Sequence, residues 1–199
     1  MSDCNILVLV SGGGTNLQAL LDAGQAGEFK GISVVIADRP CYALERAKAA
    51  GVPTLLAEPD KSIPRQERRR DLSNRILALA ESHAIDLIVL AGFLSILAGD
   101  LVQRYSNRII NLHPSLLPKF GGDGMYGEHV HRAVLEAGEN ESGCTVHLVD
   151  SGIDTGAILL QRRVPVLPGD TPALLAARIH AEEHIAIVEA VKMIALKHR

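Results

Sequence analysis

Asn111 and His113 stand two residues apart at the end of an apolar run, so their side chains could act on one substrate atom. Residues two apart in a strand project from the same face, and Leu112 between them projects from the other. An amide donor beside an imidazolium suits oxyanion stabilisation and proton transfer, which a tetrahedral acyl-transfer intermediate requires. The alternative is a core histidine that is satisfied by the backbone.

Asp154 lies in a short run between Gly152 and Gly156, downstream of another predicted strand. A carboxylate near His113 would raise the pKa of that imidazole and hold its tautomer. An aspartate that simply forms a turn explains the same residue equally well. The residues alone leave both interpretations open.

The stretch 11–16, Ser-Gly-Gly-Gly-Thr-Asn, follows a short apolar run and precedes a helical pattern. Such a loop can turn its N–H groups, with the N-terminus of the next helix, towards an anion such as a phosphate. A tight turn without a ligand is the alternative. Leu17 stands where a dinucleotide fingerprint has its third glycine, and no Gly-Lys-Ser/Thr occurs, which disfavours nicotinamide and P-loop binding.

His180, Glu183 and His184 match the H-x-x-E-H pattern of some zinc proteases. Only 15 residues follow His184 to supply a further ligand, and the predicted helix is long and amphipathic. Solvated histidines are therefore favoured. His129 and His131 face apart on a predicted helix, so no metal site is expected.

The stretch 65–70, which holds four arginines, opens another predicted helix. A solvated helix face accounts for most of it, although one of these arginines could reach an acidic ligand tail.

The hydrophobic periodicity predicts short strands that alternate with helices. Strands are expected at 5–10, 32–37, 54–56, 86–91, 108–113, 145–149 and 158–164. Helices are expected from Leu17, at 43–50, from a cap at Ser62 with Pro64 in the first turn, at 100–105, at 128–137, and from Thr171-Pro172 nearly to His198. The segment 114–127 holds two prolines and four glycines, and a loop of that length is usually functional.

This alternation predicts a single α/β domain over residues 1–199. Its sheet should be doubly wound and mostly parallel, with right-handed crossovers and helices on both faces. The segment 86–91 is apolar after its first residue, as expected of a central strand buried on both faces. Ligands of such sheets bind at the carboxyl ends of the strands.

Composition disfavours some classes of binding partner. The formal net charge of −3 and the aromatic content of 3% disfavour binding to nucleic acid or to an anionic membrane. The three cysteines form no C-x-x-C pair, the N-terminus carries no secretory signal, and the apolar runs are too short to span a bilayer. We therefore expect a cytoplasmic protein.

Several motifs together resemble the glycinamide ribonucleotide formyltransferases of purine synthesis, a Rossmann-like branch of the folate-dependent formyltransferases. They are the glycine-rich loop 11–16, Ala-Gly-Phe at 91–93, Asn-x-His-Pro-Ser-Leu-Leu-Pro at 111–118, and the stretch from Gly143 to Asp154-x-Gly156. The match covers nearly the whole chain in order.

The resemblance implies transfer of formyl from 10-formyltetrahydrofolate, as co-substrate and without a metal, to the amine of glycinamide ribonucleotide. It implies that the catalytic residues are Asn111, His113 and Asp154. It implies that the substrate is held at Gly14, Thr15, Asn16, Glu183 and His180. It implies that the folate is held at Arg65, Leu94, Ser95, Ile96, Leu97 and Asn111. The N-terminal part would bind the phosphate, the C-terminal part would bind folate and catalyse, and the protein would act as a monomer or homodimer.

Two positions depart from the pattern. Many relatives carry Met-Arg where this chain has Leu94-Ser95, and Lys or Gln where it has His180. Methionyl-tRNA formyltransferases and most deformylases need an added domain for which this chain has no room. The remaining alternatives are a formyltetrahydrofolate deformylase or a non-catalytic nucleotide-binding Rossmann protein that uses Asp38 on a ribose.

Overall fold

The computed structural model describes residues 4–195, and of Arg65 only the backbone. Its centre is one seven-stranded sheet of strand order β3-β2-β1-β4-β5-β6-β7. The parallel strands are β1 (Ile6–Val10), β2 (Ile32–Ala37), β3 (Thr54–Leu56), β4 (Leu87–Leu90) and β5 (Ile109–His113). The strands β6 (Glu141–Leu148) and β7 (Ile158–Pro165) are each antiparallel to the preceding strand. The prediction of a mostly parallel α/β sheet is confirmed.

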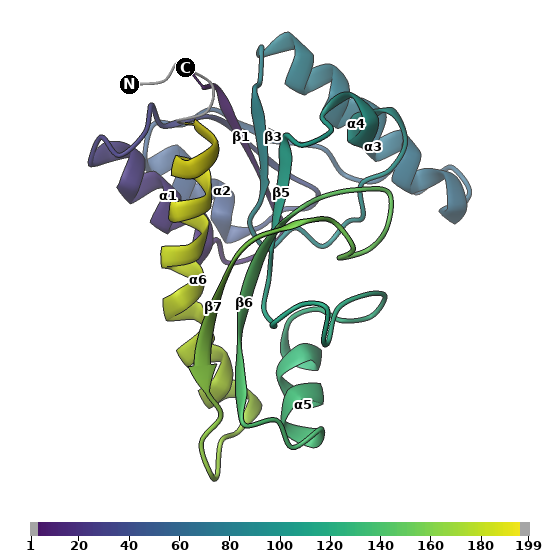
Figure 1. Cartoon of the computed structure of the whole chain (residues 1–199). Coiled ribbons are helices and arrows are strands. Elements are labelled where there is room, and N and C mark those ends of the chain that lie inside the picture. Colours follow the sequence, from purple (N-terminus) through teal and green to yellow (C-terminus); the bar gives the residue numbers. More distant parts are fainter. Residues whose placement is uncertain (1–3, 196–199) are drawn as a thin grey trace.

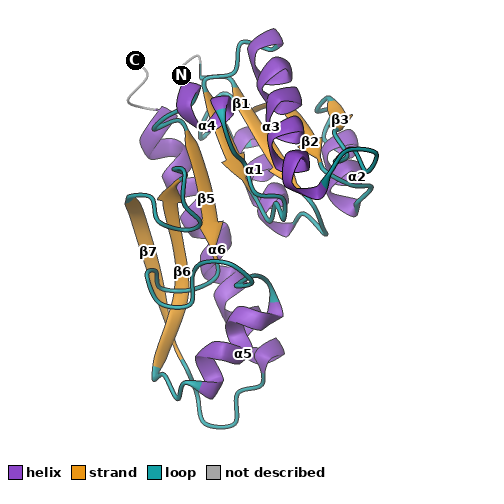
Figure 2. Ribbon diagram, turned by 90° about the vertical axis from the view of Figure 1, so that its right-hand side faces the viewer, coloured by secondary structure: helices purple, strands orange, loops and turns teal. Residues whose placement is uncertain are grey.

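Helices cover both faces of the sheet (Figures 1 and 2). The helices α1 (Thr15–Gln25), α2 (Tyr42–Ala49) and α6 (Pro172–Ala195) pack into one hydrophobic cluster, which α5 (Glu128–Glu136) joins at its last turn. The helices α3 (Arg65–Ser82) and α4 (Asp100–Arg104) pack into a second cluster on the opposite face. The arrangement is the doubly wound one that the alternation of elements predicts.

The strand β1 explains why the two clusters form on opposite faces. Ile6, Val8 and Val10 belong to the cluster under α1 and α6, whereas Leu7 and Leu9 belong to the cluster under α3. All five are at most 1% exposed. Because successive side chains alternate across a strand, a continuously apolar run feeds both cores, and each such side chain contributes roughly 1.5–3 kcal/mol of transfer free energy.

The strand β6 begins four residues before its predicted start. Its early part pairs with β7, where Glu141 lies opposite Pro165 and Gly143 opposite Arg163. A Cβ atom at Gly143 would lie 1.9 Å from the carbonyl oxygen of Arg162, so only glycine lets the two backbones approach. That glycine interrupts the apolar alternation and hides the start of the strand in the sequence.

The direction of β6 decides where the segment 149–157 lies. Leu148 at the end of β6 is level with Ile110 near the start of β5, so the carboxyl end of β6 points away from the end of β5. The chain must therefore fold back to bring Asp154 towards His113. Gly156 permits this turn, since a Cβ atom there would lie 1.9 Å from the carbonyl oxygen of Leu148.

The two predicted helix caps have different outcomes. The prediction that Ser62 caps α3 is wrong: its N–H and hydroxyl both donate to Asp60, at 2.8 and 2.6 Å, and the residue in the N-cap position is Pro64. Asx-type turns compete with capping in this way. Thr171 does cap α6, where its hydroxyl oxygen accepts the N–H of Leu174 at 3.3 Å. The predicted extension of this helix towards His198 lies outside the described residues.

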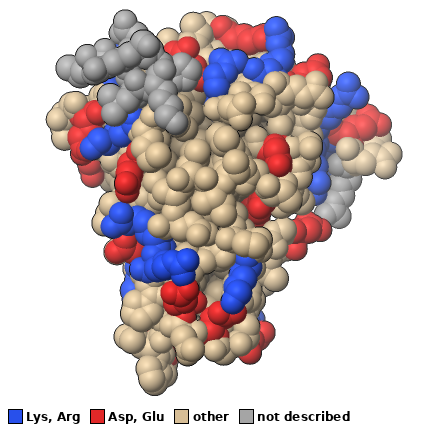
Figure 3. Space-filling model, viewed as in Figure 1, with Lys and Arg blue, Asp and Glu red and all other residues tan. Residues whose placement is uncertain are grey.

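The surface carries charges of both signs. On the face drawn in Figure 3, acidic and basic side chains are interspersed around a largely uncharged middle. Within residues 4–195, no helix has both the length and the apolar character of a membrane span.

Candidate active site

A cavity of about 820 Å³ opens beyond the carboxyl ends of β1, β4 and β5. This is the edge of the sheet at which ligands are expected. Its wall is formed mainly by the stretches 12–16, 90–97, 111–114, 122–127 and 152–154. The cavity therefore brings together the glycine-rich loop, the segment after β4, the end of β5 and both long loops of the second half of the chain.

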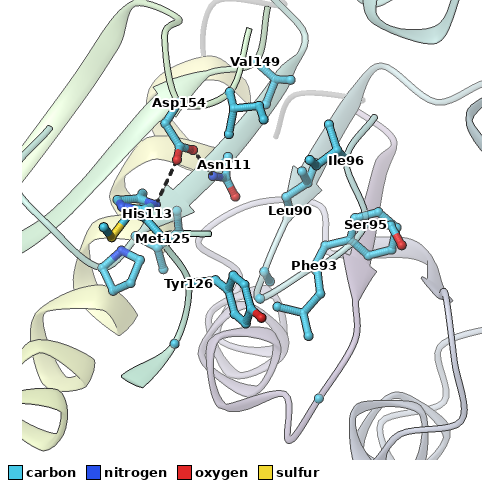
Figure 4. A pocket seen from close by; sticks show the side chains of 18 of the residues that line it. Leu90, Phe93, Ser95, Ile96, Asn111, His113, Met125, Tyr126, Val149 and Asp154 are labelled. Carbon is cyan, nitrogen blue, oxygen red and sulfur yellow. Dashed lines mark hydrogen bonds and ion pairs between the residues drawn. The ribbon is translucent and has the colours of Figure 1, made fainter. Parts of the chain in front are cut away.

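Asn111 and His113 project from one face of β5 into this cavity, as their spacing predicts (Figure 4). His113 is 4% exposed, and both of its ring nitrogens face acceptors. Nε2 lies 2.8 Å from the carbonyl oxygen of Phe120, and Nδ1 lies 3.4 Å from Oδ2 of Asp154. Only an imidazolium could donate to both, so the geometry around the ring is suited to the charged form.

The Asp154 carboxylate acts on the pKa of His113 in the expected upward direction, but the net pKa is not raised. Burial lowers this pKa, and it outweighs the opposite effects of the Asp154 carboxylate and the Phe120 carbonyl, so the net direction is downward. Desolvation disfavours the charged form of a buried imidazole. In the free protein His113 is therefore mostly neutral at pH 7. The two acceptors beside its ring would stabilise the imidazolium once further negative charge develops next to it.

Asp154 joins the two long loops. Its Oδ2 accepts the N–H of Gly122 at 3.0 Å, and its Oδ1 lies 3.5 Å from Nδ2 of Asn111. Burial alone would raise its pKa, but hydrogen bonds from His147 and Gly122 and the nearby His113 hold the pKa below its ordinary value. The carboxylate is therefore ionised at neutral pH.

The backbone at Asp154 is in the left-handed region, with φ 58°. Aspartate and asparagine tolerate this conformation better than other non-glycine residues, at a cost of roughly 1–2 kcal/mol. A purely turn-forming role would favour glycine here. Strain retained at a residue whose carboxylate faces His113 is typical of a functional position.

His147 belongs to the same group of side chains, although no motif in the sequence marks it as functional. It is 2% exposed, its Nε2 lies 3.5 Å from Oδ1 of Asp154, and the same nitrogen lies 3.1 Å from Nδ2 of Asn111. Its Nδ1 lies 2.8 Å from the carbonyl oxygen of Leu148. A His147 with its proton on Nδ1 accepts the Asn111 amide, whereas a doubly protonated ring would donate to Asp154.

In the sequence, His147 is marked only by its position in a segment in which apolar and polar residues alternate as in a strand. What places it in the site is the register of the β5–β6 pair, which sets His147 directly opposite Asn111. Cross-strand neighbours of this kind cannot be found until the two strands are known to pair.

The glycine-rich loop forms another part of the cavity wall. Gly12, Gly13, Gly14, Thr15 and Asn16 all border the cavity, and α1 begins at Thr15. Gly14 has φ 75°, and a Cβ atom there would lie 2.6 Å from Cβ of Ala43. The free N–H groups of the first turn of α1 thus face a cavity, which is the arrangement of an anion site.

Glu183 and His180 of α6 border the cavity beside this loop. Glu183 is 4% exposed, and its Oε2 accepts the amide N–H of Asn16 at 3.1 Å and lies 3.8 Å from Nε2 of His180. The Oδ1 atom of Asn16 is buried and has no hydrogen-bond partner among the described residues. A buried acceptor without a partner beside an open cavity is suited to a ligand hydroxyl or amine.

The residues Leu94, Ser95, Ile96 and Leu97, which the resemblance assigns to the folate, all border the cavity. Ser95 donates its hydroxyl to Oδ2 of Asp38 at 2.6 Å, and Asp38 also pairs with Arg39 through both carboxylate oxygens at 3.0 Å. Asp38 is therefore engaged with protein side chains, which argues against its use on a ribose. The side chain of Arg65 lies outside what the structure describes; Arg69, one turn further along α3, borders the cavity.

The H-x-x-E-H residues do not gather around a shared point. Glu183 turns to Asn16, and the side chain of His180 is 52% exposed. The expectation of solvated histidines is wrong for His184, whose Nε2 is buried without a hydrogen-bond partner among the described residues. Within residues 4–195, no cluster of three or more His, Cys, Asp and Glu residues has the arrangement of a metal site.

The family model described as "Formyl transferase" matches residues 4–191. The phosphoribosylglycinamide formyltransferase of Escherichia coli K12 is 40% identical over 182 residues, which cover 90% of this chain and 82% of that protein. The trifunctional purine biosynthetic protein adenosine-3 of Drosophila melanogaster is 42% identical over 193 residues, and this chain spans only 14% of its length.

A crystal structure of glycinamide ribonucleotide transformylase 1 from Symbiobacterium toebii superposes with a TM-score of 0.87 at 43% sequence identity. The superposition covers 98% of this chain and 88% of that one. The sequence match, the structural match and the cavity built around Asn111, His113 and Asp154 agree with one another. This chain is a member of the formyl transferase family.

Proposed function

We propose that this protein transfers the formyl group of 10-formyltetrahydrofolate to the primary amine of glycinamide ribonucleotide, giving the formylated ribonucleotide and tetrahydrofolate. The observation that carries the proposal is one cavity in which an ionised carboxylate, an imidazole and an amide stand next to a helix N-terminus suited to a phosphate. Chains about 40% identical to this one bear the name of this activity.

In the proposed reaction the amine attacks the formyl carbon directly and forms a tetrahedral intermediate. The second N–H of the Asn111 amide and the ring of His113 stabilise the oxyanion. Neutral His113 takes the proton that the amine loses, directly or through water, and delivers it to the folate nitrogen as the carbon–nitrogen bond breaks. One proton thus moves from the acceptor amine to the leaving nitrogen, and no covalent adduct with the protein forms.

Asp154 has two roles in this proposal. Its negative charge faces Nδ1 of His113, so it stabilises the imidazolium that exists only while the intermediate does. Its bonds to the Gly122 N–H and to His147 fix the carboxylate in place before substrate arrives. A charge that needs no reorganisation during the reaction is the most effective kind of electrostatic stabilisation.

In this proposal other residues hold the two substrates. Gly14, Thr15 and Asn16 bind the phosphate, Glu183 the ribose, and His180 the edge of the phosphate site; Arg65 and Leu94 to Leu97 bind the folate. The chain acts as a single domain, as a monomer or a homodimer, in the cytoplasm. Its partners are these two small molecules rather than nucleic acid or membrane, and no metal ion takes part.

A spectrophotometric assay with 10-formyltetrahydrofolate tests the proposal, with glycinamide ribonucleotide, other amines and water offered as acceptors. We expect formyl transfer to glycinamide ribonucleotide alone. Hydrolysis without transfer would show a deformylase instead. Binding of NADH in a fluorescence titration, with no affinity for folates, would show a non-catalytic nucleotide-binding protein.

A further inference from the structure

The helix α2 contacts the glycine-rich loop from the side away from the cavity. The backbone N–H of Ala43 donates to the carbonyl oxygen of Gly12 at 3.1 Å, and Nε of Arg46 donates to the carbonyl oxygen of Gly13 at 2.8 Å. Neither Ala43 nor Arg46 borders the cavity. Two successive carbonyls of the loop therefore accept hydrogen bonds from α2, on the side of the loop away from the cavity.

Arg46 is itself fixed in place. Its Nη1 donates to Oε1 of Gln18 at 3.1 Å, and Nε2 of Gln18 donates to Asp22 at 2.8 Å. The guanidinium also lies 5.1 Å from the centre of the Tyr42 ring, within cation–π range. One half-buried side chain thus ties α2, the glycine-rich loop and α1 together.

Through the geometry of the peptide bond, these contacts determine which way the N–H groups of the loop point. In a trans peptide the carbonyl of one residue and the N–H of the next point opposite ways. Holding the Gly12 and Gly13 carbonyls towards α2 therefore turns the N–H groups of Gly13 and Gly14 away from α2. Three consecutive glycines have no side chains to impose that orientation, so it has to come from outside the loop.

We infer that Arg46 is a positioning residue for the anion site: it holds the glycine-rich loop so that its N–H groups, with the first turn of α1, converge on the phosphate of the acceptor. The inference rests on the proposed function, because the phosphate belongs to the proposed substrate. Arg46 itself makes no contact with the substrate. Its loss should weaken phosphate binding and leave the chemistry at His113 intact.

Arg46→Met tests this, because methionine keeps an unbranched apolar stem and removes every donor. We expect the KM for glycinamide ribonucleotide and the inhibition constant of inorganic phosphate to rise about tenfold, the usual order for losing a charged hydrogen bond. The kcat and the KM for the formyl folate should stay within about twofold, since uniform binding alone is lost. Arg46→Lys should recover part of the affinity through one bond to the Gly13 carbonyl.

Lys48→Met is the matched control, since Lys48 lies on the same helix and its ammonium pairs with Glu45 of that helix, at 2.9 Å. It removes one positive charge from α2 without touching the loop, so its constants should be those of the parent. A tenfold rise in both variants would mean that general charge, and not positioning, is responsible.

Gln18→Leu provides a second variant, which removes the partner of Arg46 Nη1 but keeps Arg46. It tests the inference if Arg46→Met does not fold. We expect a smaller rise of about threefold in the same two constants, the order of one neutral hydrogen bond. Unchanged constants in folded Arg46→Met, or in Gln18→Leu if that is the only folded variant, overturn the inference. A parent protein that binds neither glycinamide ribonucleotide nor phosphate would instead overturn the proposed function.

Discussion

Asn111 and His147 lie directly opposite each other in the antiparallel β5–β6 pair, with Asn111 Nδ2 3.1 Å from His147 Nε2. The proposed catalytic amide is thus oriented by a residue of the neighbouring strand. Side chains that orient a functional group commonly matter almost as much as the group itself.

Replacing His147 with Phe should keep the volume of the side chain and remove both ring nitrogens. The Asn111 amide then loses its acceptor, and Asp154 loses a partner that lowers its pKa. We expect kcat to fall about 10- to 100-fold. A cooperative thermal unfolding transition should show that the variant is folded. His83→Phe, at an exposed position, is the control. A folded His147→Phe protein with the kcat of the parent would contradict this role.

Asp154 can be replaced in two ways that separate chemistry from backbone strain. Asp154→Asn and Asp154→Ala both remove the charge that faces His113, so each should lower kcat by roughly 10²- to 10³-fold. Asparagine tolerates the left-handed backbone at φ 58°, whereas alanine does not. Urea unfolding should therefore find the alanine variant about 1 kcal/mol less stable than the asparagine variant. Equal stabilities would mean that the loop relaxes.

Gly14→Ala should disturb the anion site more than its backbone angle alone explains. Gly14 and Gly51 have nearly equal φ values of 75° and 74°, but only at Gly14 would a Cβ atom meet Ala43. We expect Gly51→Ala to cost about 1 kcal/mol of unfolding free energy and Gly14→Ala about 2–4 kcal/mol. Only Gly14→Ala should raise the KM for glycinamide ribonucleotide. Denaturant unfolding and steady-state kinetics together check both statements.

His131 should make stability depend on pH. Burial lowers its pKa from 6.5 to about 4, with a smaller contribution from nearby His180. Because the unfolded chain takes up the proton near pH 6.5 and the folded one does not, the stability of the neutral buried ring is lost as pH falls between these values. The loss attributable to this residue reaches about 3 kcal/mol near pH 4.

Urea unfolding of the parent and of His131→Gln between pH 7 and pH 4 measures that loss. The difference in unfolding free energy between the two proteins should shift steadily in favour of the variant as pH falls. A difference that stays constant over this range would show that His131 does not titrate as described.

The sequence predicts the parts of this molecule that follow from a single segment. The alternation of β1 between two cores, the shared face of Asn111 and His113, and the cap at Thr171 each depend only on local period and chemistry. The glycine-rich loop before α1 is recognisable for the same reason. Each was found where it was expected.

Properties that depend on two segments were missed or had the wrong sign. His147 becomes part of the site only through the register of β6 with β5, and the turn back to Asp154 only through the antiparallel direction of β6. The pKa of His113 goes down because burial outweighs the carboxylate, and burial is a sum over the whole fold. The cap of α3 is an exception, because it is local and was still predicted wrongly: Ser62 bonds to Asp60 in a turn that competes with the helix cap.

The carboxylate of Asp154 stands between two imidazoles, with Nδ1 of His113 at 3.4 Å from one oxygen and Nε2 of His147 at 3.5 Å from the other. Each oxygen of this carboxylate therefore faces a different ring, one on β5 and one on β6. The carboxylate cannot turn about its Cβ–Cγ bond without leaving one of the two rings, so the pairing of β5 with β6 sets the direction in which Asp154 presents its charge.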